Sequence, residues 1–515
     1  MKKKTFLKIS IAVIVALALL LAMNAQVFAS ITSTSNTSSI TVSGLEAGVT
    51  VTAYRVIIVN YDYDADQPST PMYEWATTSI AEWVQTNYPN YYDIETFSEI
   101  TDADALAEFY SDLASAISQG TVTTELSYTE ETTGTQEYPV TEANAISSVT
   151  FNDVQMGQYV IITENGYRVY TPSTANVVPS YDSDEESSTY GEWLLSESYS
   201  ATVKSTTPQI TKTVTNETNI ADNLSTIDTI YYTVVADVPT YAEGSVSTTY
   251  KISDELSSGL TLNTSSFEVY GDSTLLSEDE EYTISATANS YTITFTYSKI
   301  SSYKQITVTY TATLNQDSTL VIGSTGNTNT ATLTYSNNPY KTSSSQSQSD
   351  GATVYTYGIT ITKLDNDDKT TPLVGAEFTL SDSEGNVLSF IKVDGVYYLA
   401  NSTDEGATST LTTDDTGTIS IKGLDVGTYI LVETKAADGY NVDSTEIEIT
   451  LTDNNLDGLL DDENSGIYEY TVYNKTGFSL PTTGGIGTTI FVTVGILLVG
   501  CGVALIVASK KRNNK

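Results

Sequence analysis

The stretch QITVTYTATL (residues 305–314) alternates apolar and polar side chains along its whole length, and YTITFTY (291–297) does the same just before it. Alternation with period two, in β-branched and aromatic residues, is typical of a strand with one buried and one solvated face. Similar short runs, separated by Gly, Asn and Asp, recur from about residue 30 to residue 475. The sequence therefore predicts an all-β fold whose sheets pack face to face as β-sandwiches.

Three blocks of such runs follow one another. The first, residues 30–203, has a helical interruption, ADALAEFYSDLASAI (103–117), whose apolar residues recur at helical spacing. The second comprises residues 204–350, and a polar stretch (341–352) that we interpret as a linker separates it from the third. The third comprises residues 351–476. A chain of 515 residues is long enough for each block to bury its own core, so we expect tandem immunoglobulin-like β-sandwich domains in a row.

Both ends of the chain carry targeting patterns. Residues 1–29 have a basic start, a long apolar stretch and a small-residue site, which predicts a signal peptide cleaved before Ser30. An uncleaved membrane anchor is the alternative. Residues 486–509 contain no charge and precede a basic tail (510–515), which predicts a transmembrane helix with a cytoplasmic tail. The region between them is then expected outside the cell.

Composition excludes several classes of function. The formal net charge of −42 would repel nucleic acid, which is bound through clustered Lys and Arg. The absence of histidine excludes Ser-His-Asp and Cys-His catalysis and the two-histidine zinc helix. Because Cys501 is the only cysteine, the chain cannot form an internal disulfide. An extracellular fold of this sequence must be held together by something else.

A short motif stands directly before the predicted span. The segment 477–485 contains Leu-Pro-Thr-Thr-Gly, and the span and basic tail follow it in that order. The arrangement resembles the cell-wall sorting signal that sortases of Gram-positive bacteria read. The resemblance implies that a sortase thiolate attacks the Thr483 carbonyl, releases Gly484 and passes the acyl group to an amine. An exposed turn before a membrane anchor is the alternative. The motif residues are Leu480, Pro481, Thr482, Thr483 and Gly484.

The third block contains a carboxylate in an unexpected place. In GTYILVETKAADGYN (427–441), alternation puts Tyr429, Leu431 and Glu433 on one strand face, among apolar neighbours. Burial raises the pKa of a carboxyl and lowers that of an amine, so a buried pair is held neutral. A neutral lysine is a nucleophile, and a protonated carboxyl beside an Asn amide can shuttle protons to departing ammonia. That chemistry would join Lys to Asn by an isopeptide bond.

Three motifs of this block, ITKLDNDDKTTPLVGAEFTL, YILVET and YTVYNKTG, resemble the collagen-adhesin B-type domain of Gram-positive pilins and adhesins. The resemblance implies that Lys363 is the nucleophile, Asn474 the acceptor and Glu433 the proton shuttle of an isopeptide bond. The alternative is that Glu433 is a carboxylate at the rim of the domain and Lys363 a surface lysine.

The middle block resembles the A-type domain of the same proteins through TPQITKTV, YKISDELSSGLTL and GNTNTATLTYSNNP. The resemblance implies Lys212 as nucleophile, Asp254 as proton shuttle and Asn329 as acceptor. Asn327 lies two residues earlier on the same strand face, so the choice between the two asparagines stays open. Asp254 could instead begin a turn.

Lysines are absent between Ile9 and Val203, and Lys204 is the first to follow, at the junction of the first two blocks. Strand pairing would be interrupted here, which leaves a side chain accessible. Backbone pilins carry a lysine at this boundary, often as Tyr-Pro-Lys, and its amine attacks the acyl-sortase of the next subunit. In this chain the residues are Thr202-Val203-Lys204, so the match is by position. A solvated linker lysine is the alternative.

An acidic stretch, DNNLDGLLDDEN (453–464), follows the spacing of a calcium loop. The loop would end on a bidentate Glu, but position twelve is Asn464. An acidic solvated hairpin is an equally good interpretation of this stretch. Calcium is the only cofactor that the sequence suggests, and the proposed chemistry requires none. The candidate ligands are Asp453, Asn455, Asp457 and Asp461.

The resemblance covers nearly the whole chain and implies the structural shaft subunit of a Gram-positive pilus, anchored to the cell wall. Its partners would be sortase, identical pilin subunits, peptidoglycan or a basal pilin, and a host surface. Its chemistry would be a single turnover on itself, not enzyme activity. The alternative is a cell-wall-anchored adhesin or minor pilin that is never polymerised through Lys204. A wall-anchored hydrolase would need a carboxylate pair in a cleft, and no spacing singles one out.

Overall fold

The computed structural model describes residues 28–477, with short gaps, and residue 499. The sorting motif lies outside the described residues. Nearly all residues of the predicted signal peptide and of the predicted span also lie outside them. Within the described part of the chain, no helix is both long and apolar enough to cross a membrane. The gaps are residues 33–34, 99, 135–146, 216–223, 242–244, 247, 342–343 and 462–464.

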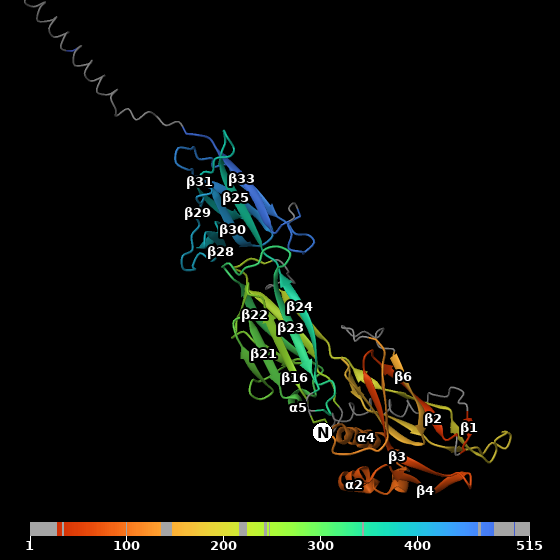
Figure 1. The fold of residues 1–515 in the computed structure, drawn as a ribbon. Coiled ribbons are helices and arrows are strands. Elements are labelled where there is room, and N and C mark those ends of the chain that lie inside the picture. Colours follow the sequence, from red (N-terminus) through yellow and green to blue (C-terminus); the bar gives the residue numbers. More distant parts are fainter. Residues whose placement is uncertain are drawn as a thin grey trace, which may run out of the picture. The chain divides into compact units, whose positions relative to one another are not determined.

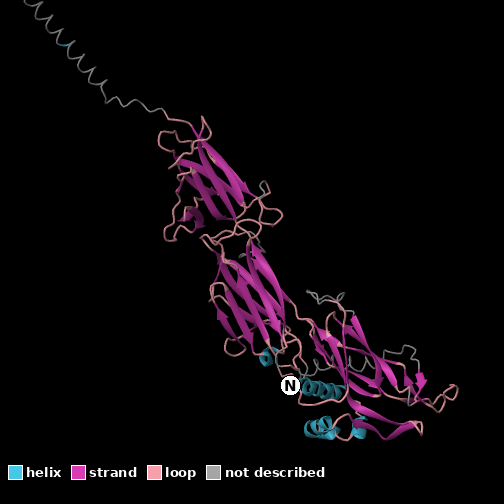
Figure 2. Ribbon diagram, viewed as in Figure 1, coloured by secondary structure: helices cyan, strands magenta, loops and turns pink. Residues whose placement is uncertain are grey.

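Strands make up most of the described chain, which confirms the all-β prediction (Figure 2). Contacts divide the chain into two compact units. The first contains residues 1–220, 229–312 and 328–353, and the second contains 221–228, 313–327 and 354–515.

The first block, together with the junction that follows it, contains thirteen of the described strands. They are β1 (Phe28–Ser30), β2 (Thr37–Leu45), β3 (Thr50–Asp62), β4 (Gln67–Trp75), β5 (Ser127–Glu131), β6 (Ser147–Gln155), β7 (Gly157–Glu164), β8 (Val169–Thr171), β9 (Ser173–Val177), β10 (Ser180–Tyr181), β11 (Trp193–Ser196), β12 (Ser198–Thr202) and β13 (Lys204–Thr206). Strands β4-β3-β7-β9 form one sheet with β5 against β3, and β12-β2-β6 form another. Two smaller sheets are β1-β11-β10 and β13-β8.

The predicted helix is present as α4 (Ala103–Ser118), with Asp102 as its N-cap. Three shorter helical segments precede it: α2 (Thr78–Asn87), the 3₁₀ turn η1 (Pro89–Tyr91) and α3 (Ile94–Ser98). One buried cluster packs Phe109 and Leu113 of α4 against Val160 and Ile162 of β7. The opposite face of β7 joins a second cluster. Because both faces are covered, β7 is apolar without alternation.

The middle block is a sandwich of two sheets. Its strands are β14 (Ile210–Thr215), β15 (Ile230–Asp237), β16 (Tyr250–Leu256), β17 (Leu260–Leu262), β18 (Glu268–Gly271), β19 (Thr274–Leu275), β20 (Tyr282–Ala286), β21 (Ser290–Phe295), β22 (Gln305–Leu314), β23 (Asn327–Tyr335) and β24 (Gln346–Val354), with the short helix α5 (Tyr297–Ile300). One sheet runs β14-β15-β22-β18-β19, with β17 against β22, and the other runs β20-β21-β16-β23-β24.

Most of the polar stretch that we interpreted as a linker forms strand β24 instead. Its residue Gln348 is buried and donates a hydrogen bond to the Tyr335 hydroxyl at 2.9 Å. Ser347 and Ser349 form side-chain hydrogen bonds with Thr334 and Thr332 on β23. The stretch is polar because β24 is the last strand of its sheet, with serines on the solvated side.

The last block is a second two-sheet sandwich. Its strands are β25 (Tyr357–Asp365), β26 (Glu377–Asp382), β27 (Ser389–Val393), β28 (Val396–Ala400), β29 (Leu411–Thr412), β30 (Thr418–Leu424), β31 (Gly427–Lys435), β32 (Ile447–Leu451) and β33 (Ile467–Asn474). The sheets run β27-β28-β30-β25-β33 and β29-β26-β31-β32 around one buried cluster. The first strand, β25, and the last, β33, are parallel neighbours (Figure 1).

The predicted signal-peptide cleavage site falls inside a strand. In β1, Phe28, Ala29 and Ser30 pair with residues of β11. Cleavage before Ser30 would leave only one residue of β1 in the mature chain. The sheet of the cleaved protein is then expected to consist of β10 and β11 with Ser30 alone against them.

Candidate functional site

The three predicted residues of the last block lie on three strands that meet in its core. Lys363 comes from β25, Asn474 from β33 and Glu433 from β31. The parallel register sets Asp365 opposite Asn474, two residues beyond Lys363. Alternation along β25 and β31 turns Lys363 and Glu433 inward, and all three predicted residues are buried.

Their polar atoms form one cluster. The Lys363 ammonium donates to the Asn474 side-chain oxygen and lies 3.1 Å from Glu433 Oε1. The Asn474 amide nitrogen donates to the same Glu433 oxygen at 2.7 Å. The second oxygen of Glu433 accepts the Asp443 backbone N–H at 2.7 Å, which fixes the carboxylate. The structure therefore brings together the predicted nucleophile, acceptor and proton shuttle.

Electrostatics at this cluster make the amine easier to deprotonate than a solvated lysine. Burial lowers the pKa of Lys363, and the attraction of the Glu433 carboxylate opposes that effect. The Lys363 amine also faces the Phe378 ring, at 5.4 Å from its centroid. A buried amine in contact with a carboxamide and a carboxyl has the groups that amide exchange requires.

In the middle block, the predicted residues lie on both sheets of the sandwich. Lys212 comes from β14 in one sheet, while Asp254 on β16 and Asn329 on β23 belong to the other. Lys212 and Asp254 form a buried ion pair. Burial lowers the pKa of Lys212 to about 8 and raises that of Asp254, and the pair's mutual attraction opposes both shifts.

A residue that the sequence analysis missed completes this cluster. The Tyr310 hydroxyl accepts hydrogen bonds from Lys212 Nζ at 2.5 Å and Asn329 Nδ2 at 2.9 Å. It donates to Asp254 Oδ2 at 2.9 Å. Tyr310 lies at an inward position of QITVTYTATL, so its burial was readable from the alternation. The alternation does not tell which residues of the facing sheet it meets.

The two candidate asparagines of β23 have different surroundings. Asn329 reaches Tyr310 in the buried cluster. The Asn327 side-chain oxygen instead accepts a hydrogen bond from the Val321 N–H at 3.2 Å. Its amide nitrogen donates to the Val321 carbonyl at 3.0 Å and to the Val354 carbonyl at 3.3 Å. Asn329 is therefore the better placed acceptor for Lys212.

Lys204 is the first residue of strand β13 and is exposed. Its strand pairs with β8, and Lys204 stands opposite Thr171. The next residue, Ser205, accepts a hydrogen bond from Arg168 Nη1 at 3.2 Å. Partial burial lowers the pKa of Lys204. The junction is thus a short ordered strand, where we expected interrupted pairing, and the amine is accessible on it.

The candidate calcium ligands differ in their surroundings. Asp453 is buried and accepts hydrogen bonds from the Tyr357 hydroxyl at 2.5 Å and the Gly458 N–H at 2.8 Å. Asp461 accepts from the Asn454 side chain at 2.6 Å. Asn455 and Asp457 are exposed. Among the residues that the structure describes, no three acidic, His or Cys residues form a group that could hold a metal ion. Asn464 lies outside them.

Calcium binding at this loop stays a prediction with a direct test. If the loop binds calcium, millimolar calcium raises the melting temperature of the protein, since a ligand that binds only the folded state stabilises it. The Asp457→Ala variant should lose this shift and change the melting temperature little in the absence of calcium, because Asp457 is exposed and its carboxylate accepts an exposed hydrogen bond from the Leu459 N–H at 3.0 Å. Equal melting temperatures of the wild type with and without calcium would reject the site.

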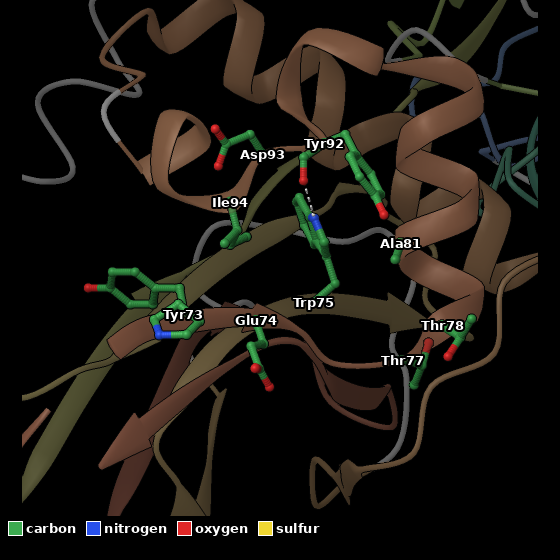
Figure 3. A pocket seen from close by; sticks show the side chains of 10 residues that line it. Tyr73, Glu74, Trp75, Thr77, Thr78, Ala81, Tyr92, Asp93 and Ile94 are labelled. Atoms are coloured by element: carbon green, nitrogen blue, oxygen red, sulfur yellow. Dashed lines mark hydrogen bonds between the residues drawn. The ribbon is translucent and has the colours of Figure 1, made fainter. Parts of the chain in front are cut away.

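A hollow of about 440 Å³ lies on the first block, between β4, the start of α2 and residues 92–94. Figure 3 shows Trp75 at its centre, with Glu74 and Asp93 on different sides. The Trp75 indole N–H is donated to the Tyr92 carbonyl at 3.0 Å. The hollow is thus the junction where the helical segments dock on β4.

Comparisons with known protein families match three parts of the chain. Residues 357–465 match a prealbumin-like fold domain of the SpaA type. Residues 227–339 match a Cna-B-like domain of Gram-positive pilin backbone subunit 2. Residues 473–515 match the LPXTG cell wall anchor motif. The middle block thus matches a Cna-B-like model, whereas its motifs resembled an A-type domain.

Among individual proteins, the chain is 26% identical over 272 residues to the trypsin-resistant surface T6 protein of Streptococcus pyogenes serotype M6. That match covers 48% of this chain and 46% of the relative, so it spans about half the relative's length.

Solved structures that share the fold include two pilins. The T6 backbone pilin of serotype M6 Streptococcus pyogenes matches with a TM-score of 0.60 and 22% identity, over 82% of this chain and 81% of that one. The full-length major pilin SpaD from Corynebacterium diphtheriae matches with a TM-score of 0.50 and 19% identity, over 86% and 98% of the two chains.

Proposed function

Because this chain carries the domains of Gram-positive backbone pilins and an LPXTG cell wall anchor motif, we propose that it is the shaft subunit of a cell-wall-anchored pilus. In this proposal sortase joins Thr483 of one subunit to Lys204 of the next. Self-formed bonds, Lys212 to Asn329 and Lys363 to Asn474, stiffen each subunit. The observation that supports it best is the buried cluster of Lys363, Glu433 and Asn474.

The chemistry proposed for the last block uses only groups in contact. The neutral amine of Lys363 attacks the side-chain carbon of Asn474, and a new C–N bond forms. Glu433, within hydrogen-bond distance of both nitrogens, takes a proton from the attacking nitrogen and gives it to the leaving nitrogen. The old C–N bond breaks and ammonia leaves. No cofactor is needed, and the reaction occurs once per cluster.

The position of this bond suits a subunit under tension. Strand β25 enters the last block and β33 leaves it, and the two are hydrogen-bonded neighbours. A pull on the ends of the block would shear their ladder. A covalent bond between Lys363 and Asn474 carries the force past those hydrogen bonds. In a chain without disulfides, this bond supplies the cross-link that an extracellular fold otherwise lacks.

The proposed polymerisation uses an amine that is exposed on an ordered strand. Lys204 begins β13, and its side chain is accessible to an acyl-sortase. The described residues of the first block before β13 contain no lysine. Among the described residues, Lys204 therefore has no competing lysine side chain on that block.

The intact mass of the purified protein tests the internal bonds. Each isopeptide bond releases one ammonia, so we expect the mass of the unmodified sequence less two ammonia molecules. Digestion should yield two cross-linked peptide pairs, one containing Lys212 and Asn329 and the other Lys363 and Asn474. An unmodified mass would reject both bonds, and the loss of one ammonia would reject the bond whose cross-linked pair is missing.

A further inference from the structure

The two buried clusters differ in how the carboxylate reaches the acceptor. In the last block, one oxygen of Glu433 is within hydrogen-bond distance of both Lys363 and Asn474. In the middle block, Asp254 contacts Lys212, and the Asn329 amide nitrogen donates to Tyr310. Among the hydrogen bonds of the described residues, none joins Asp254 to Asn329.

The difference in reach has a simple chemical origin. Aspartate is one methylene shorter than glutamate, and the Tyr310 hydroxyl occupies the place between Asp254 and Asn329. A hydroxyl has one proton to donate and two lone pairs to accept with. Tyr310 uses all three: it donates to Asp254 and accepts from Lys212 and Asn329. The hydroxyl touches both the attacking and the leaving nitrogen.

We propose that Tyr310 is a catalytic residue of the middle block, whose hydroxyl relays a proton from Asp254 to the leaving nitrogen of Asn329. The proposal rests on the isopeptide bond of the proposed function. It assigns to the pair of Asp254 and Tyr310 the task that Glu433 performs alone in the last block.

In this relay every bond that forms or breaks, and every proton that moves, is accounted for. The Lys212 nitrogen forms a bond to the side-chain carbon of Asn329 and gives a proton to Asp254 Oδ2. Asp254 passes a proton to the Tyr310 oxygen while Tyr310 passes its own proton to Asn329 Nδ2. The Cγ–Nδ2 bond then breaks, its electron pair stays on nitrogen, and ammonia leaves. Tyr310 and Asp254 end as they began.

The hydroxyl must pass one proton on as it takes another up. Tyr310 is buried, and desolvation raises its pKa well above the usual value, so a phenolate is unfavourable at this site. A concerted transfer avoids that ion. The ring is held in place by Tyr232, stacked at 5.3 Å between centroids, and by Tyr291, edge-on at 5.1 Å.

The packing makes Tyr310→Phe a clean test, because phenylalanine keeps the ring and removes only the hydroxyl. The full chain is expressed in a short pulse, samples are quenched in denaturant at successive times, and the cross-linked peptides are quantified by mass spectrometry. General acid–base catalysis contributes about 10²–10⁴-fold, so we expect the Lys212–Asn329 bond to form at least about 10²-fold more slowly. The Lys363–Asn474 bond should form at the wild-type rate in the same molecules.

Two further variants separate proton relay from packing. Tyr250→Phe removes a buried hydroxyl of the same block that donates to the Ala236 and Asp237 carbonyls, and it should leave both rates unchanged. Adding Asp254→Glu to Tyr310→Phe supplies a longer carboxyl, and we expect it to restore much of the lost rate.

Each outcome decides the proposal. Selective slowing by Tyr310→Phe with rescue by Asp254→Glu supports the relay. A wild-type rate in Tyr310→Phe overturns it, and slowing without rescue overturns it in favour of a packing role. If the wild-type chain itself lacks the Lys212–Asn329 peptide, the isopeptide bond of the proposed function fails, and the relay fails with it.

Discussion

Replacing Lys204 by arginine is expected to abolish the ladder of covalent, detergent-resistant polymers on the cell surface. Arginine keeps the positive charge and the length of the side chain at the start of β13. Its guanidinium stays protonated, with a pKa above about 12, and cannot attack an acyl-sortase as the lysine amine does. Electrophoresis of cell-wall extracts in detergent, followed by immunoblotting, shows the ladder directly.

The matched control for this variant is Lys251→Arg. Lys251 is exposed on β16, so the change alters a surface lysine without touching the junction. Its ladder should equal that of the wild type. A ladder that persists in Lys204→Arg would show that another amine is the acceptor. A wild-type protein that forms no ladder at all would instead support the non-polymerised adhesin or minor pilin.

Replacing Glu433 by alanine should leave Lys363 and Asn474 unjoined and destabilise the last block severely. Closing a loop of about 100 residues by a cross-link contributes about 4–5 kcal/mol to stability by the analogy with disulfides, and the two partners here are 111 residues apart. Removing the carboxylate also leaves a buried amine without its charged partner. We expect the melting temperature, measured by calorimetry, to fall by roughly 10–20 °C. The intact mass should lie one ammonia, and not two, below the mass of the variant's unmodified sequence.

The control for Glu433→Ala is Glu377→Ala. Glu377 pairs with Lys435 at 2.7 Å, but both side chains are partly or largely exposed, and such surface pairs contribute little. This variant should keep the cross-link and nearly all of the stability. Formation of the Lys363–Asn474 bond in Glu433→Ala at the wild-type rate would contradict the shuttle role.

Alternation predicted the strand faces well, because burial of one side is a local property of the sequence. It placed Glu433 inward on β31, whereas Lys363 was assigned through the resemblance to the B-type domain, and the structure has both residues buried. The structure also brings Asn474 to them. Pattern reasoning could not find Tyr310, because its role depends on which residues of the facing sheet it meets. Such contacts link residues far apart in sequence, so the periodicity of a single strand does not predict them.

The errors of the sequence analysis have related causes. Helices α2 and α3 are short, and their stability comes from docking on β4, which the helical period alone does not reveal. Strand β24 is polar because it lies at a sheet edge, so its composition resembles a linker. In both cases the tertiary position of the segment, and not its own residues, decides the structure.

Peptide mapping of assembled polymer by mass spectrometry tests the central claim most directly. The claim is that subunits are joined through the acyl group of Thr483 on the amine of Lys204. We predict a branched peptide in which the Leu-Pro-Thr-Thr segment is attached to the side chain of Lys204. Attachment to any other lysine, or polymer without such a branched peptide, would contradict it.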